Sequence, residues 1–195
     1  MATPSRRDQI LEAALHLFRT NGFANVSTRD ISAHAGISRS HIYHYFADWN
    51  ELRREAFARF ATEQFEQVKV AVEHMTPDEA LAFFLSDCLP ATDDDSWVLW
   101  LDAWDEAMHD AKLSATYLAV NQQWQELLAG IVQRGVDAGS YLCESPTRVA
   151  RQLFALAMGY ANDLMLLRSD DERSAMESEL AEVARLLLGT STPHG

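Results

Sequence analysis

The sequence predicts an all-α protein of about nine helices, with a three-helix helix-turn-helix domain at the N-terminus and a larger helical domain after it. Apolar residues recur at helical spacing along nearly the whole chain, whereas no run of alternating β-branched residues is bounded by hairpin turns. Capping residues, prolines and glycines divide this pattern into segments. We therefore expect two domains, over residues 1–46 and 47–195.

Three short helices are predicted before residue 47. The first ends at Asn21-Gly22, because glycine readily adopts the left-handed conformation that closes a helix. The second begins at the capping residue Ser27 or Thr28 and ends at Gly36, and the third begins at Ser38. Their core-facing residues are predicted to be Ile10, Ala13, Ala14, Leu17 and Phe18 in the first, Ile31 and Ala35 in the second, and Ile42 and Phe46 in the third.

Six longer helices are predicted after residue 47. Asp48 caps one that runs to about Met75 and connects the two domains. Thr76-Pro77-Asp78-Glu79 joins a capping box to a proline in the first turn, which indicates a helix that ends near Pro90. Negative charge at Asp93, Asp94 and Asp95 favours a helix start at about residue 97. The others cover residues 113–138, then 146–167 after the capping residue Ser145, and a last stretch with Met176, Leu180, Val183 and Leu187.

Length and composition favour a soluble, cytoplasmic protein without a cofactor or a metal site. Charged residues interrupt every apolar stretch before it reaches the roughly eighteen residues of a membrane span. Residues 1–7 also lack the apolar core of a signal peptide. Cys88 and Cys143 are far apart and lack the spacing of zinc ligands. No catalytic or phosphate-binding motif is present, and the seven histidines lack ligand spacing, so we do not expect an enzyme.

The net charge of −13 argues at first against a nucleic-acid partner, because Lys and Arg supply most non-specific affinity for phosphates. The charge is unevenly distributed, however. Residues 1–46 contain five arginines and three carboxylates, whereas the remainder contains 11 basic and 26 acidic residues. A mildly basic N-terminal domain on an acidic body would orient the molecule toward DNA.

Residues 28–45 fit the spacing of a helix-turn-helix motif. Gly36 stands at the turn, where a residue must tolerate positive φ, and small or apolar residues stand where the two helices must touch: Ile31, Ser32, Ala35, Ile37 and Ile42. The outward face of the third helix carries side chains that can hydrogen-bond to base edges or phosphates: Ser38, Arg39, Ser40, His41, Tyr43 and His44. This pattern predicts a surface that reads double-stranded DNA.

The segment Ile37-Ser38-Arg39-Ser40-His41-Ile42-Tyr43-His44-Tyr45-Phe46 resembles the third helix of the TetR family of bacterial regulators, and Asn21-Gly22-Phe23 to Ile31 resembles that family's turn into the second helix. The resemblance implies that Thr28 contacts a phosphate at the start of the second helix, that Arg39, Ser40 and His41 lie nearest the bases, and that Tyr43 and His44 contact phosphates. Arg29, next to Thr28, is also predicted to bind DNA. Trp49 departs from the pattern, because many members have a lysine there that makes a further backbone contact. Whether the chain keeps such a contact is left open.

Operator DNA with two half-sites requires two reading helices, and a homodimer supplies them about one helical turn, or a multiple of it, apart. In the TetR family the last two helices of each subunit form a four-helix bundle. The stripes that match these helices here are Val149, Leu153, Leu156, Tyr160 and Leu164, followed by Leu180, Val183 and Leu187. The alternative is that both stripes pack only inward.

Aromatic residues cluster in the middle of the chain. Trp97, Trp100 and Trp104 recur on one side of a helix, near the acids and amides Asp102, Asp105, Asn121, Asn162 and Asp163. Carboxylates beside aromatic faces suit a cation, and residues 100–107 resemble the sensor domain of the choline-responsive BetI-like branch of the family. We predict a cationic or amphipathic small-molecule effector at Phe84, Trp100, Trp104, Asp105, Tyr117, Asn121, Trp124, Asn162 and Asp163. The alternative is that these aromatic residues are simply core.

The resemblance implies a ligand-responsive homodimeric repressor, which a small molecule releases from its operator by binding one conformation better than the other. The long helix after Asp48 would transmit this change. The rival interpretation is a helical protein-interaction module without DNA binding, which the acidic body and Trp49 would suit.

Overall fold

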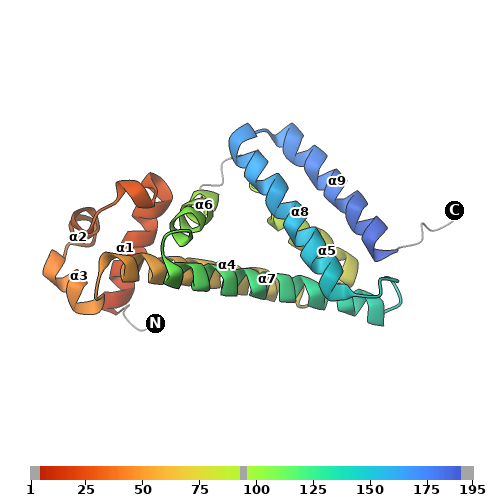
Figure 1. The fold of residues 1–195 in the computed structure, drawn as a ribbon, viewed down its shortest axis with the longest axis horizontal. Coiled ribbons are helices and arrows are strands. Elements are labelled where there is room, and N and C mark those ends of the chain that lie inside the picture. The colour runs from red at the N-terminus through yellow and green to blue at the C-terminus, as the bar shows by residue number, and fades with distance from the viewer. Residues whose placement is uncertain (1–4, 93–95, 190–195) are drawn as a thin grey trace. The chain divides into compact units, whose positions relative to one another are not determined.

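Residues 5–92 and 96–189 are described by the computed structural model. They form nine α-helices and one short 3-10 helix, η1, with no strand among them, which confirms the predicted all-α class (Figure 1). The elements are α1 (Arg6–Asn21), η1 (Phe23–Asn25), α2 (Thr28–Ala35), α3 (Arg39–Tyr45), α4 (Trp49–Val72), α5 (Pro77–Asp87), α6 (Ser96–Ala107), α7 (Ala111–Asp137), α8 (Pro146–Leu167) and α9 (Asp170–Leu188). The predicted acidic start at Asp93, Asp94 and Asp95 lies outside the described residues. None of the described helices is long and apolar enough to span a membrane.

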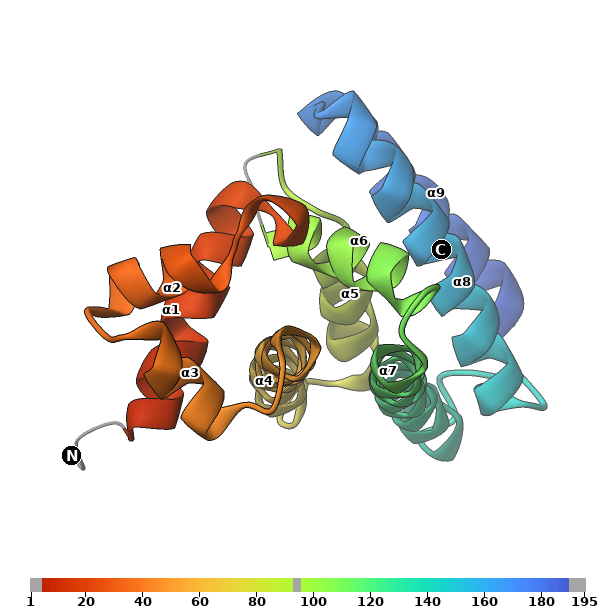
Figure 2. The same cartoon turned by 60° about the vertical axis from the view of Figure 1, so that its left-hand side comes forward.

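The described residues of the first compact unit are 5–64 and 96–120, so it joins α1, α2, α3 and α6 to the first parts of α4 and α7. Within it, α1 packs on α2, α2 packs on α3, and α6 packs on α1 and η1 (Figure 2). Its fully buried side chains include Ile10, Phe18, Ile31, Ile42, Phe46, Leu52, Phe57 and Leu99. Leu17, predicted for the core, is half-buried, and Leu15 is buried in its place.

The described residues of the second compact unit are 65–92 and 121–189, so it contains α5, α8, α9 and the remaining parts of α4 and α7. The α8 and α9 helices pack side by side, and α5 packs on α9. The fully buried side chains here include Phe84, Leu128, Val132, Tyr141, Leu153 and Leu180. The apolar periodicity that predicted these helices therefore supplies their packing faces.

The two packing units are not divided at residue 46. Both α4 and α7 pass from one unit into the other, and α6 belongs with the N-terminal helices. A boundary at residue 46 would separate the helices predicted to read DNA by function rather than by packing, and it stays a prediction.

Two helices begin at a proline, as the sequence predicts. At the start of α5, Thr76 Oγ1 accepts a hydrogen bond from Glu79 N, and Glu79 Oε2 accepts one from Thr76 N at 3.0 Å. This reciprocal pair is the predicted capping box. At the start of α8, by contrast, the Ser145 side chain makes no capping hydrogen bond. Pro146 alone therefore marks that start, through its fixed φ and missing N–H.

The α4 helix ends at Val72 rather than near Met75. The guanidinium of Arg134 on α7 donates to the carbonyl oxygens of Val72, Glu73 and Met75 at 3.2, 3.4 and 3.5 Å. A helix end leaves its last carbonyls without partners along the helix, and here one arginine from a distant part of the chain supplies them. Local sequence carries no sign of this contact.

Candidate nucleic-acid interface

The α2 helix begins with a capping box that fixes its first turn. Ser27 Oγ accepts a hydrogen bond from Asp30 N, while Asp30 Oδ2 accepts from the backbone N and the hydroxyl of Ser27 at 2.8 and 2.6 Å. The hydrogen bonds from Ser27 lower the pKa of Asp30. Thr28 is the first residue of the helix, where amide groups point outward and favour an anion such as a phosphate. The sequence indicated the serine cap but not the role of Asp30.

The turn between α2 and α3 brings the two helices close together. Gly36 closes α2 with φ +64°, a left-handed conformation that favours glycine. Ser32 is buried on α2, and its hydroxyl donates to the carbonyl of Arg29 at 2.9 Å, so its polar group is satisfied inside the contact. Ile31 and Ile42, one from each helix, are buried.

The outward face of α3 is exposed along its whole length. Its residues with exposed side chains are Ser38, Arg39, Ser40, His41, Tyr43 and His44, the six that the sequence assigns to DNA. Ser38 caps the helix, because its Oγ accepts from His41 N, and it also lies 2.8 Å from Ser40 Oγ. Among the described residues, the Arg39 guanidinium has no carboxylate partner in an ion pair. It is therefore free to pair with a phosphate or a guanine edge.

Trp49 begins α4 and packs inward. Its ring lies edge-on to Phe18 with 5.8 Å between the centroids, and the Arg53 guanidinium lies 5.9 Å from its centroid. The tryptophan therefore joins α4 to the core of α1. This packing explains how an aromatic residue is accommodated at a position where the resemblance leads one to expect lysine.

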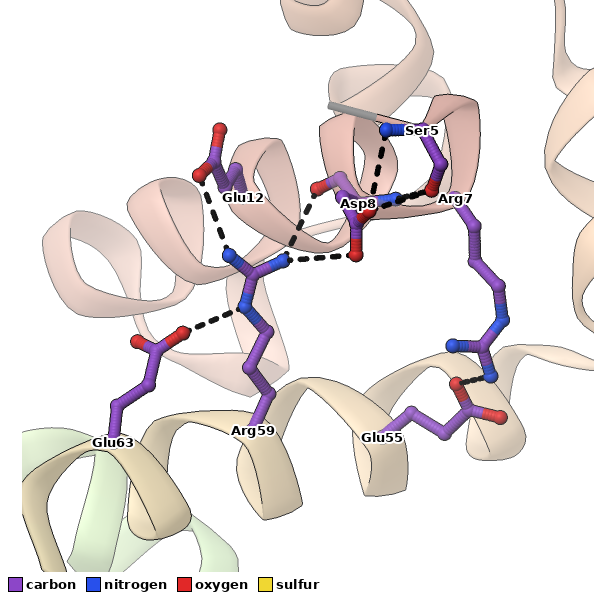
Figure 3. A network of polar contacts seen from close by, with 7 residues as sticks. All are labelled: Ser5, Arg7, Asp8, Glu12, Glu55, Arg59 and Glu63. Atoms are coloured by element: carbon purple, nitrogen blue, oxygen red, sulfur yellow. Dashed lines mark hydrogen bonds and ion pairs between the residues drawn. The ribbon is translucent and has the colours of Figure 1, made fainter. Parts of the chain in front are cut away.

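A polar network ties α1 to α4 (Figure 3). The Arg59 guanidinium reaches three carboxylates, with Nε 2.8 Å from Glu63 Oε1, Nη2 3.3 Å from Glu12 Oε1 and Nη1 3.5 Å from Asp8 Oδ1. Arg7 pairs with Glu55 beside it. The network thus fixes the N-terminal helix on the long helix that follows α3, and the sequence did not predict it.

Similarity to known proteins decides which family this chain represents. Residues 10–56 match the bacterial regulatory proteins of the tetR family. Residues 77–188, more than half of the chain, match the C-terminal domain of BetI-type transcriptional repressors. The chain belongs to the TetR family.

Relatives and solved structures agree with this assignment. The HTH-type transcriptional regulator YfiR of Bacillus subtilis is 25% identical over 95% of this chain and 91% of its own length. The regulator BetI of Klebsiella pneumoniae is 29% identical over 56% of this chain and 59% of its own length. A TetR transcription regulator from Haloarcula marismortui superposes with a TM-score of 0.83 at 20% identity, covering 93% of this chain and 97% of that one.

This TetR-family protein is a DNA-binding transcriptional regulator, and ligand-responsive repression fits its relatives. Similarity gives no support to the alternative of an interaction module without DNA binding. The relatives are regulators rather than enzymes. One further structure of the same fold, a Saccharomonospora viridis protein solved in complex with choline, has a TM-score of 0.79 at 23% identity over 90% of this chain and 93% of that one.

In the first compact unit of this TetR-family protein, two of the predicted effector residues meet. Trp100 and Tyr117 lie edge to face at 5.9 Å and share contacts with Phe57, while Trp100 Nε1 donates to Gln64 Oε1 at 2.8 Å. Trp104 is 53% exposed, and Asp105 is also exposed. The structure thus brings Trp100 and Tyr117 into one aromatic cluster and leaves Trp104 outside on the solvent side.

The remaining predicted effector residues lie in the second compact unit. Trp124 is buried against Phe84 at 5.8 Å, and Asn121 is half-buried. Asn162 and Asp163 are exposed on α8. These two polar residues therefore face solvent, and their place in an apolar helix does not require a buried polar partner.

The predicted dimer residues of α8 and α9 divide into two sets. Val149, Leu153, Leu164 and Leu180 are buried within the protomer, whereas Leu156, Tyr160, Val183 and Leu187 are half-buried. Leu166 on α8 and Leu186 on α9 are 86% and 75% exposed, although neither was assigned to the interface from the sequence. The most exposed leucines of this helix pair are therefore not those of the predicted stripes.

Proposed function

We propose that this TetR-family protein is a homodimeric repressor that binds operator DNA through the exposed face of α3 and is released from it by a small-molecule effector. The observation that carries the proposal is the composition of that face, where every exposed side chain can donate or accept a hydrogen bond. It would act in the cytoplasm, where the operator is found.

The DNA contacts divide by position on the motif. Arg39, Ser40 and His41 occupy the first turn of α3, and in helix-turn-helix proteins the N-terminal part of the second helix enters the major groove. We assign these three residues, together with Ser38, which caps the same turn, to contacts with base edges. Thr28 and Arg29 at the start of α2, with Tyr43 and His44 farther along α3, are assigned to phosphates.

We assign the dimer contact to the outward face of α8 and α9. Large exposed apolar residues on one surface mark interaction sites in soluble proteins. Leu166 and Leu186 are the most exposed apolar residues of these two helices, and the half-buried Leu156, Tyr160, Val183 and Leu187 are candidates for the same dimer contact. Tyr160 also donates to Glu179 Oε2 at 2.8 Å, which links α8 to α9 within the protomer.

A cationic or amphipathic effector is supported by the aromatic cluster of Phe57, Trp100 and Tyr117 and by the choline found in the Saccharomonospora viridis structure. Aromatic faces attract quaternary ammonium groups through their quadrupoles. An effector that binds better to a conformation with wrongly spaced reading helices lowers operator affinity by its differential affinity for the two conformations.

In vitro selection from a random-sequence duplex library tests DNA binding. We expect the wild-type protein to enrich a sequence with two inverted half-sites, whose centres lie about one helical turn or a multiple of it apart. Enrichment of no sequence, or of a single half-site without symmetry, would contradict the proposal.

The effector class is tested by isothermal titration calorimetry with choline, spermidine and the lipophilic cation rhodamine 6G, against benzoate and glucose as anionic and neutral controls. We expect heat of binding from at least one cation and loss of that heat in Trp100→Ala. Binding of only the controls would contradict the cationic class while leaving DNA binding intact.

A further inference from the structure

A side chain of α6 holds the backbone at the entrance to the DNA-binding motif. Phe23 N donates a part-buried hydrogen bond to Asp102 Oδ2 at 2.6 Å, across 79 residues of sequence. Phe23 directly follows Gly22, which closes α1, and begins η1, which leads to the cap of α2. The path of the chain from α1 into α2 is therefore fixed by a carboxylate that belongs to neither helix.

Gly22 is fitted to this approach. Its φ of +78° lies in the region that favours glycine, and a Cβ built at this position would lie 3.1 Å from Asp102 Oδ2. A side chain there would have to push the carboxylate away from Phe23. Glycine at position 22 thus serves both the turn and the close approach of α6.

The next turn of α6 makes a second link to the same residue. Glu106, four residues after Asp102, pairs with Arg53 at 2.7 Å. The Arg53 guanidinium in turn lies 5.9 Å from the ring centroid of Phe23. Consecutive turns of α6 therefore hold Phe23 by its backbone and, through Arg53, by its ring.

The environment of Asp102 disfavours the ionised form of its carboxylate. Burial raises its pKa, and Asp105 and Glu106 raise it further, while the hydrogen bond from Phe23 lowers it. Arg53 forms its ion pair with Glu106. The hydrogen bond to Phe23 is thus the favourable contact that offsets desolvation of this carboxylate.

We propose that Asp102 is a positioning residue, which couples α6 to the DNA-reading helices by holding the chain between α1 and α2. The inference rests on the proposed function, and it identifies the contact through which a movement of α6 alters the helix-turn-helix motif. Trp100 of the aromatic cluster precedes Asp102 by two residues on the same helix. A shift of α6 that lengthens the Asp102–Phe23 hydrogen bond releases the α1–α2 connection and alters the position of α3.

The test compares Asp102→Ala, which removes the acceptor, with Asp102→Asn, which keeps an acceptor oxygen without the charge. Glu126→Ala is the control, because Glu126 is an exposed carboxylate on α7 that belongs to none of the proposed DNA, effector or dimer surfaces. Amide hydrogen exchange of residues 23–46 is measured by NMR in the full-length protein, and affinity is measured for the duplex that the wild type selects. Circular dichroism melting confirms that each variant folds.

We expect Asp102→Ala to speed exchange of the Phe23 amide and of α2 and α3 amides by about tenfold, and to weaken duplex binding about tenfold, consistent with the loss of a hydrogen bond to a charged group. Asp102→Asn should restore most of both properties, and Glu126→Ala should change neither. If Asp102→Ala does not fold, Asp102→Ser serves instead, since its shorter side chain cannot reach Phe23 N.

Two results would overturn the inference. One is unchanged exchange of α2 and α3 in Asp102→Ala, and the other is faster exchange with unchanged duplex affinity. If the wild type selects no duplex, the proposed function fails, and the exchange of α2 and α3 still decides whether Asp102 positions them.

Discussion

Ile42 and Tyr43 are neighbours on α3 with opposite environments: the Ile42 side chain is 1% exposed and the Tyr43 side chain is 49% exposed. One holds α3 against the core, and the other belongs to the proposed DNA surface. Replacing each by alanine should therefore separate folding from binding. Ile42→Ala is expected to lower the free energy of unfolding by about 2–5 kcal/mol, as for other buried isoleucines.

Tyr43→Ala should leave the free energy of unfolding within about 0.5 kcal/mol of wild type, because the residue is exposed. It should weaken operator binding by roughly 1 kcal/mol through loss of a phosphate contact. Urea denaturation and fluorescence anisotropy with the selected duplex measure the two quantities. A Tyr43→Ala variant that is as unstable as Ile42→Ala would show that Tyr43 belongs to the core.

Gly130 and Gly135 lie on the same helix, α7, and should respond to alanine in opposite directions. A Cβ at Gly135 would lie 2.0 Å from Cδ2 of Tyr141, a buried ring whose hydroxyl donates to Asp78 Oδ1 at 2.8 Å. Gly135→Ala should therefore destabilise the protein by about 1–3 kcal/mol through overpacking.

Gly130 is exposed, and a Cβ there meets nothing within 4 Å. Gly130→Ala is expected to stabilise the protein by up to about 1 kcal/mol, since alanine favours the helix and restricts the unfolded chain. Thermal melting of both variants beside wild type measures the difference. Equal effects of the two substitutions would contradict the close contact between Gly135 and Tyr141.

Helix positions could be predicted because their determinants are local. The Thr76 capping box, Pro146 and the glycines at 22 and 36 act within one turn of the helix ends that they mark. The packing units could not be predicted, because they depend on contacts between distant segments. Phe23 with Asp102 and Arg134 with the end of α4 are two such contacts.

Acid should destabilise the protein partly through its helix caps. Hydrogen bonds from Ser5, Ser27 and Thr76 lower the pKa values of Asp8, Asp30 and Glu79 respectively. A carboxyl whose pKa is lower in the folded than in the unfolded state contributes stability above its unfolded pKa and loses that contribution as pH falls through the folded value.

The melting temperature should therefore fall as the pH is lowered from about 5 to about 2. Glu79→Gln keeps an oxygen acceptor for Thr76 and cannot be protonated, so its melting temperature should fall less over this range. Differential scanning calorimetry at several pH values measures both proteins. Identical pH profiles would contradict a contribution of the Glu79 carboxylate.

Trp49→Lys should lower the stability of the protein and raise its affinity for operator DNA. Trp49→Lys removes the edge-on contact with Phe18, and we expect a loss of roughly 1–2 kcal/mol in the free energy of unfolding. The added cation at the start of α4 should tighten operator binding and steepen its salt dependence by about one unit of slope per phosphate contact. Trp49→Leu is the control for loss of the ring without gain of charge. An equal slope in both variants would show that residue 49 does not face the phosphates.

The candidate DNA surface could be predicted from sequence more fully than the effector site. Along a short helix such as α3, buried Ile42 fixes which side chains face outward. The effector prediction rested on residue types whose surroundings only folding decides. The indole N–H of Trp100 donates a hydrogen bond to Gln64, and the carboxylate of Asp102 accepts one from the backbone N–H of Phe23. Both polar groups, which the sequence placed near the effector, are therefore already hydrogen-bonded within the protein.

Operator affinity of Arg39→Ala tests the central claim most directly, because Arg39 is exposed at the start of α3. Lys112→Ala removes one exposed cation from α7 and is the matched control. We predict that Arg39→Ala weakens binding to the selected duplex by about 1–3 kcal/mol and alters its sequence preference, whereas Lys112→Ala binds as the wild type does. Wild-type affinity and sequence preference in Arg39→Ala would contradict the assignment of α3 as the DNA-reading helix.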